Sequence, residues 1–153
     1  MKYKVFFILM LSLLIGCMEV KAQDTEAVTD IESMWLEHNV QYGGTKGICI
    51  HVSFTIDNMQ GRSIQVGAYF FDDEGNRVRA YNAPAQYRSR DGQLCSCSQA
   101  YVKYESTRWD DFKLFIPHGY LRDGDYECIV QISSNRGVVL AISDSESFSK
   151  NSY

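Results

Sequence analysis

The chain has 153 residues, of which 45% are hydrophobic and 22% charged, and its formal net charge is −4 at pH 7. This acidic balance argues against a nucleic-acid partner, because binding to phosphates depends on clustered Lys and Arg side chains. Ten Tyr and eight Phe, with only two Pro, favour a strand-rich globular domain over a disordered chain.

The first 23 residues have the pattern of an export signal. Lys2 and Lys4 form a short basic segment, and an apolar run follows from residue 5 to residue 15, interrupted only by Ser12. A membrane-spanning helix needs about 20 apolar residues, so this shorter run predicts a signal peptide and not a membrane span. We therefore expect an exported protein, located in the periplasm or at the outer membrane and cell surface.

Two processing schemes fit the end of this signal. Residues 14–17, Leu-Ile-Gly-Cys, have the form of a lipobox, in which case Cys17 becomes the acylated first residue and a lipid anchor. Several acyl chains on one cysteine are enough for stable tethering to a membrane. Alternatively, cleavage after Ala22, with Val20 at the −3 position, removes a signal peptide of residues 1–22 and frees a secreted protein. The sequence leaves both schemes open.

Behind a polar tether at residues 23–30, the pattern predicts one β-sandwich domain over residues 31–149. The clearest strand is 48–56, where apolar and polar residues alternate, which indicates one core face and one solvent face. Turn signals every 8–12 residues separate the strands, and together they predict an all-β fold, a single antiparallel β-sandwich of seven to eight strands. The segments expected as strands are 31–41, 48–56, 64–71, 77–81 (weak), 93–102, 111–116, 126–133 and 138–142.

Four cysteines remain under either processing scheme: Cys49, Cys95, Cys97 and Cys128. Export exposes a protein to oxidising conditions, so a disulfide is one expectation. Cys95 and Cys97 share one face of a strand and would form a strained bridge with each other, so the bond would join one of them to Cys49 or Cys128. Free, half-buried thiols are an alternative. A zinc site that combines the thiols with His51 is a third.

Two further groups of residues are candidates for binding. Asp72, Asp73 and Glu74 offer the oxygen ligands that calcium takes, although the same residue types are typical of a solvated hairpin loop. Trp109 and Tyr104 lie in a polar connection, where exposed rings would form a binding surface and buried rings would cover the core. Nothing in the sequence indicates a resident cofactor.

Catalytic motifs are missing from the sequence. It contains no Gly-x-Ser-x-Gly elbow, no His-Glu-x-x-His zinc motif and no glycine-rich phosphate loop. Cys49 and His51 are about 6–7 Å apart along one strand, which is unfavourable for a nucleophile and its base. We therefore expect a non-catalytic interaction module that binds a protein or glycan of the cell envelope. A calcium-dependent binding domain and a hydrolase of unrecognised type are the alternatives.

Several segments, taken in order, carry a family resemblance. They are residues 35–40, 50–54, 68–71, 91–93, 104–107 and 111–117. They resemble a bacterial exported β-sandwich module, which occurs alone behind export signals or fused to repeat, kinase or zinc-ribbon domains. The resemblance covers residues 31–148 and implies an accessory module of the C2-like or immunoglobulin-like kind, without catalytic residues. This chain departs from the family pattern at His118, where the family has Tyr, and at Cys95 and Cys97.

Overall fold

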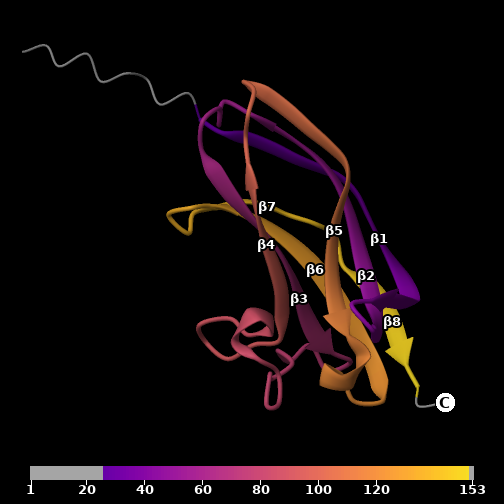
Figure 1. Cartoon of the computed structure of the whole chain (residues 1–153). Coiled ribbons are helices and arrows are strands. Elements are labelled where there is room, and N and C mark those ends of the chain that lie inside the picture. The colour runs from indigo at the N-terminus through magenta and orange to yellow at the C-terminus, as the bar shows by residue number, and fades with distance from the viewer. Residues whose placement is uncertain (1–25, 152–153) are drawn as a thin grey trace, which may run out of the picture.

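The computed structural model describes residues 26–151 and consists of two antiparallel β-sheets packed face to face (Figure 1). These residues form eight strands and no α-helix, so the predicted all-β sandwich is confirmed. Within the same residues no helix is long and apolar enough to cross a membrane. The export signal, Cys17 and both cleavage sites lie outside the described residues.

The smaller sheet has the strand order β1-β2-β5. β1 (Val28–Tyr42) and β2 (Thr45–Asp57) form a hairpin, and β5 (Ser106–Pro117) pairs with the other edge of β2. The hairpin turns at Gly43 and Gly44, whose φ angles of 57° and 81° are readily adopted only by glycine. β2 is therefore the central strand between two long edge strands.

The larger sheet has the order β4-β3-β6-β7, and β8 also pairs with β6. β7 pairs with the C-terminal half of β6 and β8 with its N-terminal half, so these two short strands act as one interrupted edge strand. The strands of this sheet are β3 (Ser63–Asp72), β4 (Cys95–Tyr101), β6 (Gly124–Ser134), β7 (Val139–Ile142) and β8 (Glu146–Lys150).

Ser143 bridges the interruption between β7 and β8. Its backbone N–H donates to the carbonyl oxygen of Val130 at 2.8 Å, and its hydroxyl accepts a hydrogen bond from the N–H of Val130, also at 2.8 Å. A side chain thus replaces one partner of the ladder, and the central β6 backbone stays satisfied where the edge strand breaks.

The hydrophobic core fills the space between the two sheets. Inward-facing residues alternate along β2, β3 and β6, as the two-residue period of a strand requires. Burial of each large aliphatic or aromatic side chain contributes about 1.5–3 kcal/mol. On these three strands the completely buried members are Ile48, Ile50, Val52, Phe54 and Ile56 of β2, Val66, Ala68 and Phe70 of β3, and Cys128, Val130 and Ile132 of β6.

The expectation of a solvent face on β2 was wrong. Cys49, His51 and Ser53 point away from the core, yet they are only 7%, 6% and 6% exposed. Their cover comes from the edge strands, because Trp35 of β1 and Lys113 of β5 both stand opposite His51 in the register. Long side chains on both flanks thus bury the second face of a central strand.

Several strand boundaries differ from the expectation. β1 begins at Val28, inside the segment expected as a polar tether at residues 23–30. β5 begins at Ser106, five residues before the expected start, and β8 was not expected at all. Residues 77–81 form isolated bridges to neighbouring segments and not a strand. A 3-10 turn, η2 (His118–Tyr120), follows Pro117. A second 3-10 turn, η1 (Ala85–Tyr87), lies in the long β3–β4 connection.

Candidate functional site

The outer face of the smaller sheet carries a polar cluster around His51, which we call the histidine cluster (Trp35, Glu37, His51, Asp111 and Lys113). The imidazole lies between two carboxylates: Nδ1 is 2.6 Å from Asp111 Oδ1, and Nε2 is 3.2 Å from Glu37 Oε2. Its flat face stacks on the indole of Trp35, with 4.8 Å between the ring centroids. All three strands of the sheet contribute to this cluster.

The surroundings of Asp111 in the histidine cluster shift the pKa of its carboxyl group. Burial raises the pKa of this carboxyl, but hydrogen bonds from His51 and from Lys113, whose Nζ lies 3.3 Å from Oδ2, lower it more. The net effect is a lowered pKa for Asp111, so its ionised form is favoured.

Cys49 and His51 do not form a nucleophile–base pair. Both imidazole nitrogens of His51 face carboxylates, so neither is directed at the Cys49 thiol. Burial also raises the pKa of Cys49, and nearby Lys113 only partly offsets this. The thiol of Cys49 is therefore kept in its neutral, weakly nucleophilic form.

A groove with a volume of about 520 Å³ runs along the open side of the sandwich, between the edge strands β4 and β5. At its floor the hydroxyl of Ser96 donates to the carbonyl oxygen of Phe115 at 2.7 Å, which ties the two sheets together. Tyr42 leans over Phe115 at the rim, with 5.3 Å between ring centroids. The lining residues are Glu37, Val40, Tyr42, Cys49, Gln86, Tyr87, Ser96, Cys97, Ser98, Lys113, Leu114 and Phe115.

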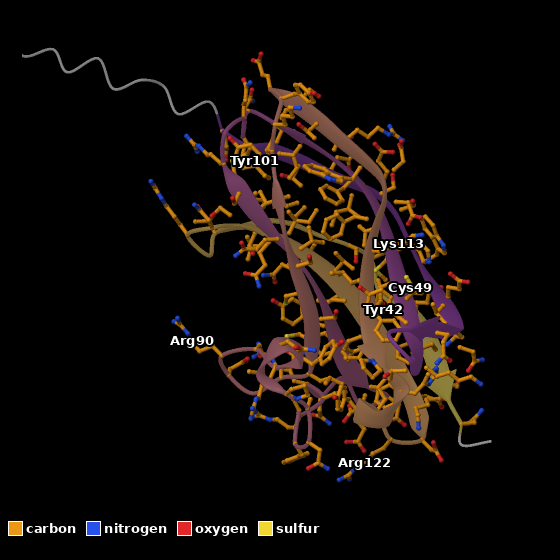
Figure 2. The ribbon with its side chains drawn as sticks, viewed as in Figure 1. Tyr42, Cys49, Arg90, Tyr101, Lys113 and Arg122 are labelled. Atoms are coloured by element: carbon orange, nitrogen blue, oxygen red, sulfur yellow. The ribbon has the colours of Figure 1, made fainter. Side chains whose placement is uncertain are left out.

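Both strands beside this groove have an open edge. Within residues 26–151, β4 pairs only with β3, and β5 pairs only with β2. Backbone groups on such edges remain available to another extended chain. In Figure 2, Tyr42, Cys49 and Lys113 lie on the same flank of the molecule, next to β5.

The four cysteines of the described residues are free thiols in three different environments. Cys49 lies on the outer face of the smaller sheet, Cys128 lies in the core, and Cys95 and Cys97 lie on the outer face of the larger sheet. No disulfide joins the Cys95–Cys97 pair to Cys49 or Cys128. The free-thiol alternative is the one that the structure has.

The metal sites considered from the sequence are not assembled. Among residues 26–151, no three His, Cys, Asp or Glu side chains come together as ligands. The zinc hypothesis fails because His51 and Cys49 are on one sheet and the Cys95–Cys97 pair on the other.

In the loop that the calcium hypothesis uses, Asp72 has a structural contact instead. Its Oδ1 accepts hydrogen bonds from the backbone N–H groups of Glu74 at 3.1 Å and Asn76 at 2.7 Å. This carboxylate therefore caps the turn, as aspartate often does in hairpins. Asp73 stands in the same loop, and neither it nor Glu74 joins a ligand cluster.

Cys97 is surrounded by groups that stabilise its thiolate. Hydrogen bonding from the Cys95 thiol is the largest influence on it; burial acts in the opposite direction, and hydrogen bonds from Tyr69 and Gln65 add to the effect of Cys95. Together they lower the pKa of Cys97 to about 6. The Cys97 Sγ lies 3.9 Å from the Tyr69 hydroxyl oxygen.

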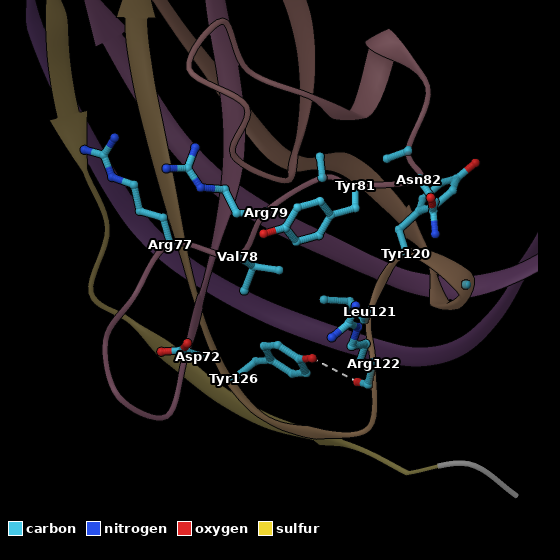
Figure 3. A pocket seen from close by; sticks show the side chains of 13 residues that line it. Asp72, Arg77, Val78, Arg79, Tyr81, Asn82, Tyr120, Leu121, Arg122 and Tyr126 are labelled. Carbon is cyan, nitrogen blue, oxygen red and sulfur yellow. Dashed lines mark hydrogen bonds between the residues drawn. The ribbon is translucent and has the colours of Figure 1, made fainter.

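A second pocket, of about 310 Å³, lies at the loop end of the sandwich, between the β3–β4 connection and the segment after η2 (Figure 3). Arg77 pairs with the Asp91 carboxylate at 2.5 Å, and Arg79 donates to the Asp91 carbonyl oxygen at 2.7 Å. Tyr126 donates its hydroxyl hydrogen to the carbonyl oxygen of Arg122 at 2.9 Å, the bond drawn in Figure 3. The charged side chains of Arg77 and Arg79 therefore stabilise the loops around the pocket.

The aromatic residues singled out from the sequence differ in how far they are buried. Trp109 was expected in a connection, but it lies within β5, half-buried and stacked on Phe54 with 4.7 Å between ring centroids, which is the alternative in which the ring covers the core. Tyr104 is exposed, with Lys103 Nζ 5.4 Å from its ring centroid. The exposed indole is Trp35, at 41%, which the apolar pattern around it did not distinguish from a core residue.

The groove itself was missed, since it depends on how the edges of two sheets meet. Two of its lining residues, Cys49 and Cys97, were among the cysteines that the sequence singled out. The two-sheet sandwich agrees with the fold that the family resemblance implies, while membership of that family stays a prediction. Comparison of the chain with protein-family models and with curated proteins finds no match.

Proposed function

We propose that this protein is an exported, non-catalytic binding domain of the cell envelope, and that the groove between β4 and β5 holds its partner, a protein or glycan. The observation that carries the proposal is the groove of about 520 Å³ with an open strand edge on either side. An extended protein segment that enters such a groove can add to a sheet edge through backbone hydrogen bonds. The geometry therefore favours a protein segment over a glycan.

The chemistry of the rim supports recognition of a mixed polar and apolar ligand. Tyr42 is exposed and Tyr87 lines the same groove, and rings with a polar tip are enriched at binding interfaces. Glu37 and Lys113 add one charge of each sign to the lining. Residues 1–23 support the location, and a lipid on Cys17 would hold the domain at the membrane.

A hydrolase is the second candidate, because His51 lies between the carboxylates of Glu37 and Asp111. A carboxylate that orients an imidazole is one part of many hydrolytic sites. Binding is favoured over this candidate because both nitrogens of His51 are engaged and its ring is 6% exposed under Trp35. Hydrolysis of ester, amide or glycoside substrates that disappears in a His51→Gln variant would favour the hydrolase instead.

The test uses the mature protein, immobilised and incubated with envelope extract from its native host. Wild type is compared with Tyr42→Ala, which removes the exposed groove ring, and with Tyr81→Ala, which removes another exposed tyrosine, at the loop-end pocket. We expect wild type and Tyr81→Ala to retain the same partner and Tyr42→Ala to retain at least about tenfold less. Retention of nothing above a blank support, or equal retention by all three proteins, would contradict the proposal.

A second arm separates the two partner classes. Protein and polysaccharide fractions of the envelope are applied separately, and the retained component is then titrated against wild type and Tyr42→Ala in solution. Calcium is added in a further arm with the unfolding temperature as readout, since a metal that binds the folded state raises it.

A further inference from the structure

Two thiols line the groove, and their surroundings are opposite. Cys49 is 7% exposed, and burial raises its pKa. Cys97 is partly exposed and has donors on either side. One groove of the described domain therefore contains a thiol suited to reaction and another that is not.

The backbone opposite Cys97 makes room for its sulfur. Cys97 stands across from Gly67 in the β3–β4 register. A Cβ added at Gly67 would come within 2.9 Å of Cys97 Sγ and 3.0 Å of the Tyr69 ring. Glycine at this position thus lets the sulfur settle against β3, where the Tyr69 hydroxyl lies 3.9 Å away.

Cys95 supports Cys97 as a donor and is not a second reactive group. It is 2% exposed, so a reagent in the groove has no access to its sulfur. The two residues are separated by one residue on an extended strand, which places their Cα atoms about 6.6 Å apart, close to the upper limit for a disulfide. A disulfide between Cys95 and Cys97 would distort the strand, whereas a hydrogen bond between their sulfur atoms requires no distortion.

We propose that Cys97 is a covalent modification site, at which the thiolate attacks a small disulfide compound entering the groove and retains half of it. The Cys97 sulfur forms a bond to one sulfur of the reagent, the reagent's own S–S bond breaks, and its second half leaves as a thiolate that takes up a proton. No other oxidant is needed. The inference goes beyond the proposed binding function, since it requires the groove only as an entrance.

The first experiment treats the reduced, full-length mature protein with oxidised glutathione and follows the intact mass and the modified peptide. At pH 7 we expect one glutathionyl group per chain, on Cys97, at a rate at least about tenfold above that of Cys49. The rate should level off at a pH well below the ordinary thiol pKa of about 8.5. Equal modification of both cysteines, or a Cys97 rate equal to that in the urea-unfolded chain, would overturn the proposal.

Variants separate the role of the donors from that of accessibility. Tyr69→Phe and Cys95→Ala each remove a donor to Cys97, so the midpoint of the rate–pH curve should rise in both. Tyr101→Phe is the matched control, because this exposed tyrosine lies on the same face of β4 with its register partner at Ser63. A midpoint unchanged in both Tyr69→Phe and Cys95→Ala would overturn the assignment.

The readouts keep this inference separate from the proposed function. Modification is measured with a defined small reagent and needs no envelope partner. Retention of the partner by a Cys97→Ser variant is measured apart from it. Loss of glutathionylation in that variant with normal retention would support the modification site as an independent property of the groove.

Discussion

The imidazole of His51 lies nearly parallel to the indole of Trp35, with 4.8 Å between their centroids and 12° between their planes. The two residues face each other across the β1–β2 ladder, and Asp111 of β5 holds the far side of the imidazole. One side chain on the central strand thus links all three strands of the smaller sheet. Cross-strand contacts of this kind are the main lateral support of a sheet.

Replacement of His51 should therefore destabilise the domain. His51→Leu removes both hydrogen bonds and leaves the carboxylates of Glu37 and Asp111 facing an apolar group, so we expect a loss of about 1–3 kcal/mol in the free energy of unfolding. Urea denaturation at pH 7 measures it. His38→Gln, at an exposed histidine of β1, is the control and should change stability by less than about 0.5 kcal/mol. Equal effects of the two substitutions would contradict this prediction.

Asp111 should make the stability of the domain depend on pH in the acidic range. Its pKa is lowered in the folded state, so its contribution is fully present above the unfolded value of about 3.9 and is lost as the pH falls below it. Wild type should lose more stability than Asp111→Asn between pH 5 and pH 3, measured by urea midpoints. Asp110→Asn, which removes a carboxylate paired with Arg108, should keep the wild-type slope. A parallel pH dependence for Asp111→Asn and wild type would rule the prediction out.

Gly47 should tolerate no side chain. A Cβ there would lie 2.3 Å from the carbonyl oxygen of Ile116 and 2.5 Å from the Phe115 ring. Because the first neighbour is backbone of the paired strand, Gly47→Ala should cost at least about 2 kcal/mol through forced strand separation. Gly119→Ala, with open space around the added atom, is the matched control and should be nearly neutral. Thermal unfolding of the two variants decides between them.

Ser143 should protect the amide of Val130. Its hydroxyl is the acceptor for that N–H, so Ser143→Ala leaves a donor of the central strand β6 without a partner at about 1–2 kcal/mol. Amide hydrogen exchange should become faster at Val130 and stay unchanged at residues 64–70 of β3. Ser145→Ala, in the same interruption, is the control. Unchanged exchange at Val130 in Ser143→Ala would show that the hydroxyl is not needed.

The sequence was sufficient for the fold class because its signals are local. Alternation over residues 48–56 and the glycine turn around residue 137 define strands and a hairpin without knowledge of the rest of the chain. β8 could not be predicted in this way, since Phe148 is its only large apolar residue and its strand state depends on pairing with β6. Tertiary pairing decides such weak strands.

The candidate site was predictable only in part. Strand spacing was enough to put Cys95 and Cys97 on one face, as it did for Cys49 and His51. The burial of Trp109 depends on the irregular register between β2 and β5 near Phe54, and such irregularities re-aim side chains. The groove could not be predicted, because it depends on the relative position of two sheet edges, and no short sequence pattern encodes that position.

The late position of β8 in the chain has a consequence for biogenesis. Phe148 is buried, stacks with Tyr126 at 5.5 Å and meets Phe70 edge-on at 6.2 Å. The hydrophobic core is therefore incomplete until residue 148 has left the ribosome, and the earlier strands cannot complete their packing before β8 has been synthesised. For the export proposed above, such a delay is an advantage, because a chain that has not yet folded can still be threaded through a membrane channel.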